Sequence, residues 1–415
     1  MTAYGELLAR LLPARRFGVV LGLERMRQIL DRLGAPDRRL GAVVHVGGTN
    51  GKGSTVAMIA ALAAAAGQRV ATYTSPHLSS LRERIQIAGA AISEAAMVAA
   101  AEQVRAAGGD ELTFFEQVTA IAMVAIAEAA VDVTVLEVGL GGRLDATNVI
   151  DPAIAVVTGV AMDHEAILGA TLAAIAGEKA GIWKPGRPAI IGASGLAEAV
   201  PVLAAAAAAA GAIVRLVDAG DVAAVPPVAL PGAHQRRNAA AAIAAVRALG
   251  LPIVAAALQQ VRHPGRFEVI DDAAGRVILD GAHNPHGAAA LAAALAERGE
   301  RPVLIAAISA DKDVAAIAAA LAPAVRAVIA TRYQQDRAMD PAALARVFAR
   351  PALAVSTAPD LPAALAMARA LGGPILVAGS LFLVGEARTL LLGAPTDPFV
   401  VTDPPANPAG GAAST

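Results

Sequence analysis

The segment HVGGTNGKGST, from His45 to Thr55, lies where an apolar run gives way to a helix-like stretch. The apolar run covers residues 41–46, and the helix-like stretch covers residues 56–66. A glycine-rich turn at such a junction exposes backbone N–H groups beside the positive end of the helix dipole, and both attract anionic oxygens. Lys52 adds a mobile positive charge. The segment therefore predicts a phosphate-binding loop for a nucleoside triphosphate.

This loop departs from the usual phosphate-loop pattern, in which GxxxxGK is followed directly by Ser or Thr. Val46 occupies the position of the first glycine, and Gly53 separates Lys52 from Ser54. A search for the strict pattern would miss the segment. A tight glycine turn without a ligand is the alternative interpretation, but glycine, lysine and serine together after a strand favour phosphate binding.

The composition indicates a globular protein with more than one domain. A chain of 415 residues can form two domains that each bury a core. The apolar fraction of 56% comes mostly from alanine, and the most apolar stretch, residues 199–214, contains Pro201 and Gly211. We therefore expect no membrane span. Without a secretory pattern after Met1 and without cysteine, we expect a cytoplasmic protein that lacks thiolate catalysis and cysteine-ligated zinc.

The charge balance argues against nucleic acid as a partner. The formal net charge is −1 and aromatic residues make up 3% of the chain, so neither a basic surface nor a set of base-stacking side chains is evident. We expect small-molecule partners. The last residues, 395–415, have little to bury and predict a disordered, dispensable tail.

Short β-branched runs alternate with alanine-rich stretches, a pattern typical of a parallel sheet covered by helices. The strands expected in the first part of the chain are residues 43–46, 70–74, 133–138, 154–158 and 189–191. The helices expected between them are residues 56–66, 115–130 and 172–181.

A second alternation follows the segment VRHPGR, residues 261–266. Its expected strands are residues 277–280, 303–307, 327–330, 352–355 and 375–378. We therefore predict an α/β protein with a P-loop ATPase-like domain over residues 1–263 whose sheet is mainly parallel. A smaller, Rossmann-like α/β domain is predicted over residues 264–394, with a hinge at Pro264 and Gly265.

Polar side chains follow several expected strands, where ligands bind in open α/β sheets. Glu137 ends the segment VTVLEV and precedes the loop GLGGRLDATN. A carboxylate there can hold Mg²⁺ together with nucleotide phosphates. The alternative is a glutamate that caps a neighbouring helix.

Two further residues have a functional and an ordinary interpretation. His164, in MDHEAILG, follows a strand and could bind metal or orient a carboxylate, or be a solvated loop residue. Lys179, in GEKAGI, lies near the end of a helix, where a lysine commonly complements the helix dipole.

The second part of the chain offers similar candidates. Arg266 lies in RFEVI, and Asp280 and His283 lie in VILDGAHNPHG, which is also an ordinary strand, turn and helix cap. Asn238 stands at the start of an alanine-rich helix, where its amide could contact a nucleotide or cap the helix.

Taken in order, the motifs resemble the folylpolyglutamate synthase and dihydrofolate synthase family of the Mur ligase superfamily. The resemblance covers residues 20–390. The matching segments are GLERM (22–26), GGTNGKGST (47–55), TSPHL (74–78), RERIQIAG (82–89), TFFE (113–116), EVGLGGRLDATN (137–148), DHEAILG (163–169), GEKAGI (177–182), RFE (266–268), LDGAHNPHG (279–287) and DKD (311–313).

The resemblance implies roles for the matching residues. Those expected to bind ATP are Thr49, Asn50, Gly51, Lys52, Gly53, Ser54, Asn238, Arg266, Asp280 and His283. Those expected to hold Mg²⁺ at two sites are Ser75, Glu137, His164 and Lys179, the last as a carbamate. Lys52, His164 and Lys179 are the expected catalytic residues.

Substrate contacts are implied for three segments. The residues expected to contact the pterin are Leu21, Thr113, Phe114, Phe115, Glu116, Leu144, Asp145 and Ala146. One position departs from the family, because Val20 stands where relatives commonly carry a polar residue. This departure puts the pterin contacts of its segment in doubt and leaves the ATP site untouched.

The function implied is ATP-dependent amide ligation. L-Glutamate would be added to dihydropteroate and to reduced folates through an acyl phosphate, by a monomeric enzyme. The alternative within the family is one of these two activities alone.

Two other functions remain to be weighed. A peptidoglycan ligase of the Mur type would carry a further domain before the loop, where this chain has about forty residues. A non-catalytic nucleotide-binding module would keep the loop, but the presence of Glu137, His164 and Lys179 argues against lost chemistry. ATP turnover that requires both an acid and an amino acid would separate a ligase from such a module.

Overall fold

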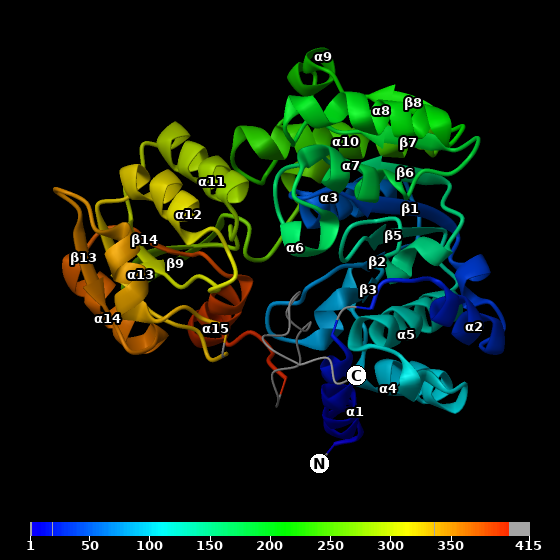
Figure 1. Cartoon of the computed structure of the whole chain (residues 1–415), viewed down its shortest axis with the longest axis horizontal. Helices are drawn as coiled ribbons and strands as arrows, with labels where there is room; N and C mark the ends of the chain where they lie inside the picture. The colour runs from blue at the N-terminus through cyan, green and yellow to red at the C-terminus, as the bar shows by residue number, and fades with distance from the viewer. Residues whose placement is uncertain (1, 19, 336, 398–415) are drawn as a thin grey trace. The chain divides into compact units, whose positions relative to one another are not determined.

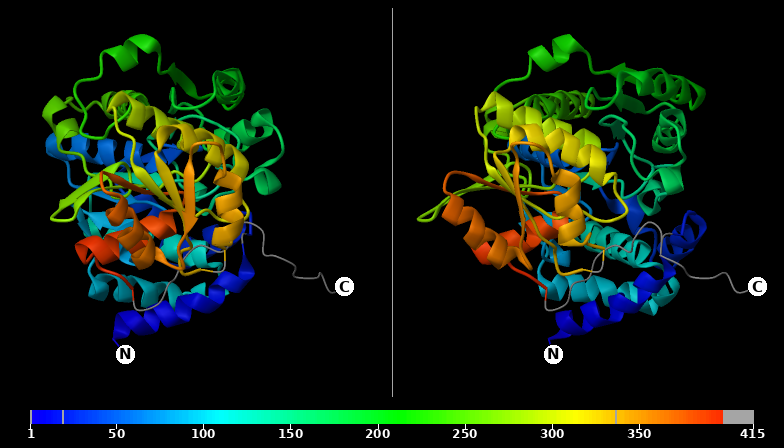
Figure 2. Two further views of the ribbon diagram at one scale, coloured as in Figure 1. Left: turned by 90° about the vertical axis from the view of Figure 1, so that its left-hand side faces the viewer. Right: turned by 60° about the vertical axis from the view of Figure 1, so that its left-hand side comes forward.

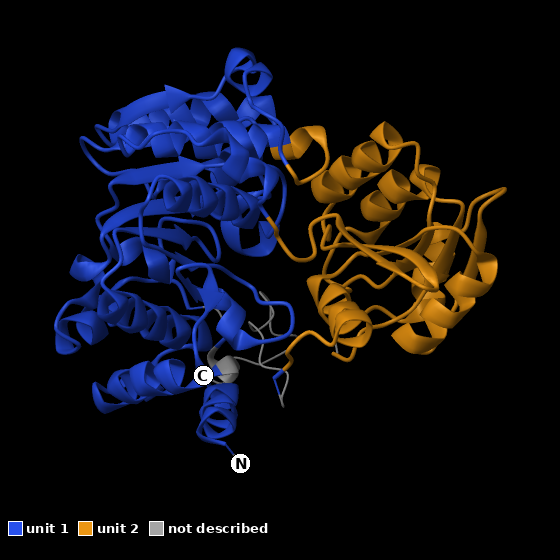
Figure 3. Cartoon of the chain, turned by 180° about the vertical axis from the view of Figure 1, so that it is seen from behind, with its two compact units in different colours: residues 1–228, 236–261, 397–415 blue, residues 229–235, 262–396 orange. Residues whose placement is uncertain are grey.

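The computed structural model describes residues 2–18, 20–335 and 337–397. The chain forms two compact units (Figure 3). Unit 1 contains residues 1–228, 236–261 and 397–415, and unit 2 contains residues 229–235 and 262–396. The chain passes into unit 2 next to the expected hinge at Pro264 and Gly265.

Unit 1 is built on an eight-stranded sheet with the order β4-β3-β2-β5-β1-β6-β7-β8. Its strands are β1 (Ala42–Gly47), β2 (Val70–Tyr73), β3 (Ile85–Ile87), β4 (Ala90–Ala91), β5 (Val133–Glu137), β6 (Ile154–Val157), β7 (Pro188–Ile191) and β8 (Ile213–Leu216). The six strands from β2 to β8 in this order are parallel, and β3 and β4 form an antiparallel extension beside β2.

Helices cover both faces of this sheet (Figure 1). The helices of unit 1 are α1 (Ala3–Leu11), α2 (Glu24–Arg32), α3 (Lys52–Ala65), α4 (Glu94–Ala106), α5 (Phe114–Ala129), α6 (Glu165–Leu168), α7 (Leu172–Ala180), α8 (Val200–Ala209), α9 (Ala219–Ala223) and most of α10 (Ala233–Ala248). One core joins α1, α2, α4 and α5 to β2, and another joins α7 and α8 to β6 and β7.

The helix α5 is mostly apolar because it is buried on nearly every side. Its side chains from Gln117 to Ala127 are buried between α4, α2 and the sheet.

In the part of the chain that the structure describes, no helix combines the length and apolar character needed to cross a bilayer.

Unit 2 is a smaller structure in which helices flank a sheet (Figure 2). The strand order of this sheet is β13-β12-β11-β14-β10-β9. Its strands are β9 (Glu268–Asp272), β10 (Gly275–Asp280), β11 (Val303–Ala306), β12 (Ala327–Ala330), β13 (Ala354–Thr357) and β14 (Ile375–Ala378). Its helices are α11 (Pro285–Glu297), α12 (Val314–Leu321), α13 (Pro341–Phe348), α14 (Leu361–Leu371) and α15 (Leu381–Leu392). Only β9 runs antiparallel among these described strands.

The predicted fold class is confirmed, with one strand displaced. The structure begins β13 at Ala354, whereas residues 352–355 were expected, because Ala352 has a φ of 65° that a strand cannot accommodate. Sequence analysis did not predict β3, β4, β8 and β9. Three of these four strands are the outer strands of their sheets, where one side faces solvent and the hydrophobic pattern is weak.

Gly41 provides a test of how tightly the chain enters β1. An added Cβ would lie 2.5 Å from the carbonyl oxygens of Val131 and Asp132, and the φ of Gly41 is 68°. Gly67 has a similar φ of 86° with no neighbour within 4 Å. Gly67→Ala should lower the free energy of unfolding by about 1–2 kcal/mol, the cost of a left-handed alanine.

Gly41→Ala should lower it by about 1–3 kcal/mol more, because the backbone of residues 131 and 132 must also move. Urea denaturation of the two variants measures the difference. Equal losses would show that the close approach at Gly41 costs nothing to relieve.

Candidate functional site

The candidate site lies at the carboxyl ends of the central strands. In the sheet, β1 lies between β5 and β6, so the connections that follow β1 and its neighbours diverge at this point. Val46 pairs with Glu137, and Gly47 pairs with Val157. The loop after β1, the last residue of β5 and the segment after β6 therefore meet at one sheet edge.

The predicted phosphate loop is shaped by two left-handed glycines. Gly48 has a φ of 134°, and Gly51, with a φ of 82°, precedes α3. A Cβ on Gly48 would collide with the Thr158 hydroxyl, and one on Gly51 would collide with the Asn238 amide. Only glycine fits these two positions, and α3 then begins at Lys52 with its N-terminus facing the loop.

The segment after β6 holds this loop in place. The Thr158 hydroxyl donates to the carbonyl oxygen of Asn50 at 2.7 Å. The Thr49 hydroxyl donates to the carbonyl oxygen of Ala161 at 3.1 Å and accepts the Ala161 N–H at 3.0 Å. These bonds fix the loop without using the N–H groups of Gly51 or Lys52.

Lys52 lies near Glu137, a predicted metal ligand, and Glu137 in turn contacts the predicted ligand Ser75. Its Nζ donates to the carbonyl oxygen of Thr49 at 3.4 Å and lies 4.0 Å from Glu137 Oε1. The other carboxylate oxygen of Glu137 accepts the N–H of Ser75 at 3.2 Å. The structure therefore brings Lys52, Ser75 and Glu137 together from three segments that are distant in sequence.

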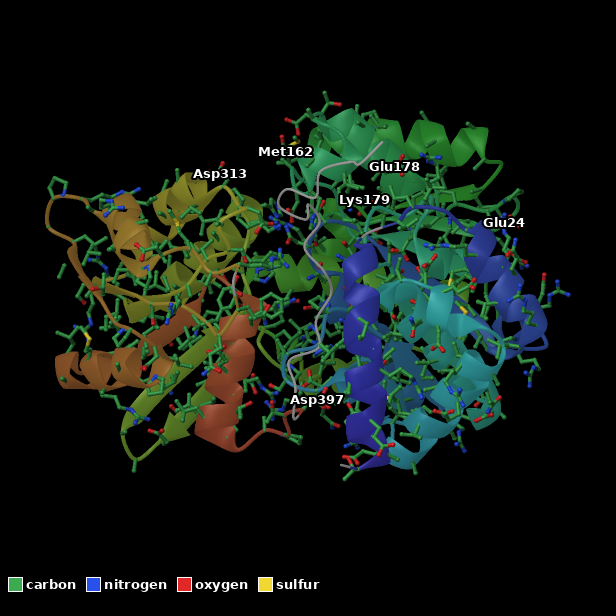
Figure 4. All side chains as sticks on the ribbon, turned by 60° about the horizontal axis from the view of Figure 1, so that its bottom comes forward. Glu24, Met162, Glu178, Lys179, Asp313 and Asp397 are labelled. Carbon is green, nitrogen blue, oxygen red and sulfur yellow. The ribbon has the colours of Figure 1, made fainter. Side chains whose placement is uncertain are left out.

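Lys179 is buried at the same place. Its Nζ donates to the carbonyl oxygen of Gly48 at 3.2 Å, and the residue is 5% exposed. Burial, followed by the charge of Lys52, lowers the pKa of Lys179 from 10.5 to about 7, although Asp163 opposes the shift. The adjacent Glu178 instead pairs with the exposed Arg143 at 2.7 Å (Figure 4 labels both Glu178 and Lys179).

His164 lies in the segment after β6, just before the short helix α6. It has a φ of 54°, an uncommon value for a residue with a side chain. Its backbone N–H donates to Asp163 Oδ1 at 2.9 Å, and its Nε2 lies 3.9 Å from the same oxygen. The structure thus ties His164 to Asp163, a residue that sequence analysis gave no role.

The donor atoms at this edge suit a divalent cation that keeps other ligands. Within the described ranges, no three His, Cys, Asp or Glu side chains gather as a metal site. Mg²⁺ needs only one or two protein carboxylates when nucleotide phosphates supply further oxygens. Glu137 with the hydroxyl-bearing Ser75 beside it fits that requirement.

The TFFE segment forms the start of α5. Thr113 and Glu116 make a capping box, in which Glu116 Oε2 accepts the N–H and hydroxyl of Thr113 at 2.8 Å each. The same oxygen accepts from Arg25 Nη2 at 2.8 Å. Phe114 is buried beneath the guanidinium of Arg84, whereas the Phe115 ring lies 6.3 Å from that of Tyr73.

The other predicted substrate residues differ in burial. Asp145 is buried and accepts hydrogen bonds from the Leu140 N–H at 2.8 Å and the Thr147 N–H at 3.0 Å. Burial raises its pKa. Ala146 is buried, Leu144 is half-buried, and Leu21 is 42% exposed in the loop before α2.

The predicted nucleotide residues divide between the two units. Asn238, in unit 1, is buried beneath Gly51 and its Oδ1 accepts from the Ser194 hydroxyl at 2.7 Å. Three others lie around the end of β10 in unit 2. Asp280 accepts the N–H of residues 267 and 282 at 2.9 and 2.8 Å, Arg266 donates to Gly265, and His283 bonds Gly281.

Several residues of this arrangement were missed from the sequence. Thr158 holds the phosphate loop, and Asp163 holds His164. Arg25 pairs with Glu116. Arg25 lies in the matching segment GLERM, so a signal was present. Thr158 carried none, because a threonine at the end of a strand is an ordinary residue there.

Two known domains match the chain in the order of its two units. Residues 46–194 match the Mur ligase middle domain. Residues 265–381 match the Mur ligase glutamate ligase domain.

Curated relatives cover most of the chain. A probable bifunctional folylpolyglutamate synthase/dihydropteroate synthase of Haloferax volcanii is 40% identical over 93% of this chain and 50% of its own length. This chain therefore spans about half the length of that relative. A dihydrofolate synthase/folylpolyglutamate synthase of Mycobacterium tuberculosis is 38% identical over 78% of this chain and 76% of its own length.

Solved structures are similar over the whole fold. The E. coli FolC structure in complex with DHPP and ADP is 32% identical, with a TM-score of 0.85 over 94% of this chain and 98% of that one. The Yersinia pestis bifunctional folylpolyglutamate synthase/dihydrofolate synthase complexed with AMPPNP and a Mn ion is 31% identical, with a TM-score of 0.80 over 90% and 94%.

The low pKa of Lys179 has a consequence for stability. Between pH 7 and 10.5 the unfolded chain binds a proton at this amine that the folded chain lacks, so stability should rise with pH across this window. Lys179→Met removes the group. In bicarbonate-free buffer, the free energy of unfolding of the unsubstituted protein should rise relative to that of Lys179→Met between pH 7 and pH 9. A difference between the two proteins that does not change with pH would contradict the lowered pKa of Lys179.

Proposed function

The chain belongs to the folylpolyglutamate synthase/dihydrofolate synthase family of Mur ligases, and we propose that it ligates L-glutamate to folate-type acids with ATP. The acids are dihydropteroate and reduced folates. One observation carries the proposal: Lys52, Glu137 and the buried Lys179 surround a phosphate loop at the sheet edge. The relatives' ADP, DHPP and AMPPNP complexes support this assignment.

The first chemical step is phosphoryl transfer. A carboxylate oxygen of the acid attacks the γ-phosphorus of ATP, the bond to the β-phosphate oxygen breaks, and ADP and an acyl phosphate form. The N–H groups at the start of α3 and the Lys52 ammonium stabilise the negative charge of the transferring group. Lys52 is held near the loop by the carbonyl oxygen of Thr49.

The second step forms the amide. The amine of glutamate attacks the acyl carbon, inorganic phosphate leaves, and the nitrogen loses a proton to solvent. Ser75, Glu137 and His164 would hold Mg²⁺, which neutralises phosphate charge when bound. Water must be kept from the acyl phosphate, since hydrolysis would waste it.

Lys179 is proposed to work as a carbamate. With a pKa of about 7, much of its amine is uncharged at neutral pH and can attack the carbon of CO₂, releasing one proton. The product is an anion beside Gly48 and near Lys52, and it would supply the second metal site with oxygen ligands. The cytoplasmic location and monomeric state expected from the sequence stay predictions.

The proposed reaction is tested with purified protein, MgATP and L-glutamate. Phosphate release should require an added acid, either dihydropteroate or tetrahydrofolate, and the acid should gain the mass of one glutamate residue. Release with both acids would establish both activities, and release with one would name a single activity. Release with neither acid, despite ATP binding, would contradict the proposal.

The carbamate is tested by replacing its lysine. Lys179→Ala should abolish turnover, and small carboxylic acids such as acetate or formate should restore part of it by occupying the place of the carbamate. Lys184→Ala is the matched control, because that lysine bonds Asn148 at 3.0 Å instead of the phosphate loop. Full activity of Lys179→Ala without added acid would refute the carbamate.

A further inference from the structure

The segment between β2 and β3 carries Ser75 and has little regular structure of its own. Apart from the short helix η3 (Leu81–Arg84) and the bond from the Thr74 N–H to the Arg84 carbonyl oxygen, the backbone N–H groups of residues 75 and 78–81 donate to side-chain carboxylates. The carboxylate of Glu83 accepts the N–H groups of residues 78, 79 and 80 at 2.8–3.0 Å. Such a loop keeps its shape only as long as its side-chain acceptors stay in place.

A second carboxylate reaches this segment from the far end of the chain. Asp397 accepts the Leu81 N–H at 2.7 Å and the Ser80 hydroxyl at 2.9 Å. It also accepts the hydroxyl of Tyr4, in α1, at 3.0 Å. Its own N–H donates to the carbonyl oxygen of Ser79 at 3.0 Å, and Figure 4 shows where Asp397 lies.

The donors of this cluster are shielded from solvent. Tyr4 is 5% exposed and Ser80 is 6% exposed. Burial, and then the charge of Asp397, raises the pKa of Tyr4, so its hydroxyl keeps its proton and donates. Without the carboxylate, two shielded hydroxyls and the N–H of Leu81 would lose their acceptor.

The same segment reaches the candidate site at its other end. The N–H of Ser75 donates to Glu137 Oε2 at 3.2 Å, and Glu137 lies 4.0 Å from the Nζ of Lys52. Between the two ends, the Nε of the buried Arg84 donates to His77 Nδ1 at 2.9 Å. The loop is therefore held by Glu137 at one end and by Asp397 at the other.

We propose that Asp397 is a positioning residue for the nucleotide site: it holds the segment from Ser75 to Leu81 so that Ser75 and Glu137 keep their places beside Lys52. Asp397 lies in the stretch 395–415 that was expected to be a disordered, dispensable tail. That expectation is corrected at Asp397; residues 398–415 lie outside the described residues. The kinetic part of the proposal rests on the proposed function, whereas the structural part does not.

The test replaces Asp397 by asparagine, which keeps the shape and removes the charge. Asp340→Asn is the matched control, because Asp340 accepts one backbone N–H, from Ala343 at 2.9 Å, at the start of α13 in unit 2. Tyr4→Phe is a milder second variant that removes a single donor. Hydrogen exchange of the amides of residues 78–81 and steady-state kinetics are measured on all three.

In Asp397→Asn we expect exchange at residues 78–81 to accelerate on the order of tenfold or more, and the KM for MgATP to rise by a similar factor. The KM for glutamate and the kcat at saturating MgATP should change little, and Tyr4→Phe should show smaller shifts in the same direction. Asp340→Asn should leave both measurements unchanged.

The two parts of the proposal fail separately. Unchanged hydrogen exchange in Asp397→Asn would show that Asp397 does not hold the segment from Ser75 to Leu81, even if the enzyme is active. Faster exchange with a lowered kcat and an unchanged KM for MgATP would overturn the positioning role and leave Asp397 as a purely structural contact. If no acid is turned over at all, the proposed function fails. The exchange result still decides whether Asp397 holds the segment from Ser75 to Leu81.

Discussion

The in-register parallel pairing of β1 with β5 and β6 is the constraint on which the rest of unit 1 depends. Val46 opposite Glu137 and Gly47 opposite Val157 bring three strand ends to the same level of the sheet. A shift of one residue would turn the buried side chains of β1 to the opposite face. Since all three strands are buried, the register is firmly determined, and with it the place where loop, carboxylate and lysine meet.

The positive charges at that place destabilise the folded chain and favour the binding of an anion. Two lysines, Lys52 and Lys179, lie close to the phosphate loop, and burial makes the second hold its proton poorly. Such a site is stabilised by an anion, either a bound phosphate or an acidic group formed on the lysine itself. Gly48 and Gly51 shape the loop for a steric reason. Only a backbone without Cβ lets Thr158 and Asn238 approach so closely.

Sequence reasoning succeeded where the physical signal is local and strong. The central strands and the glycine-rich turn between β1 and α3 combine glycine, lysine and β-branched residues in patterns that few other structures use. It failed at the outer strands, such as β8, whose four residues are all exposed. It also overlooked the readable capping box of Thr113 and Glu116, so that the second role of these residues, ordering the start of α5, came only from the structure.

The sequence by itself determined the fold class and the family and predicted the phosphate loop, because each depends on residue types in short, ordered segments. Only the tertiary structure decided which distant groups serve the loop. Ser75 and Glu137 are 62 positions apart, and Asp397 is 316 positions from Leu81. No local pattern marks an aspartate near the end of a chain as the acceptor for a loop near its start. Such a pairing depends on where packing leaves a buried donor, and packing is a property of the folded chain.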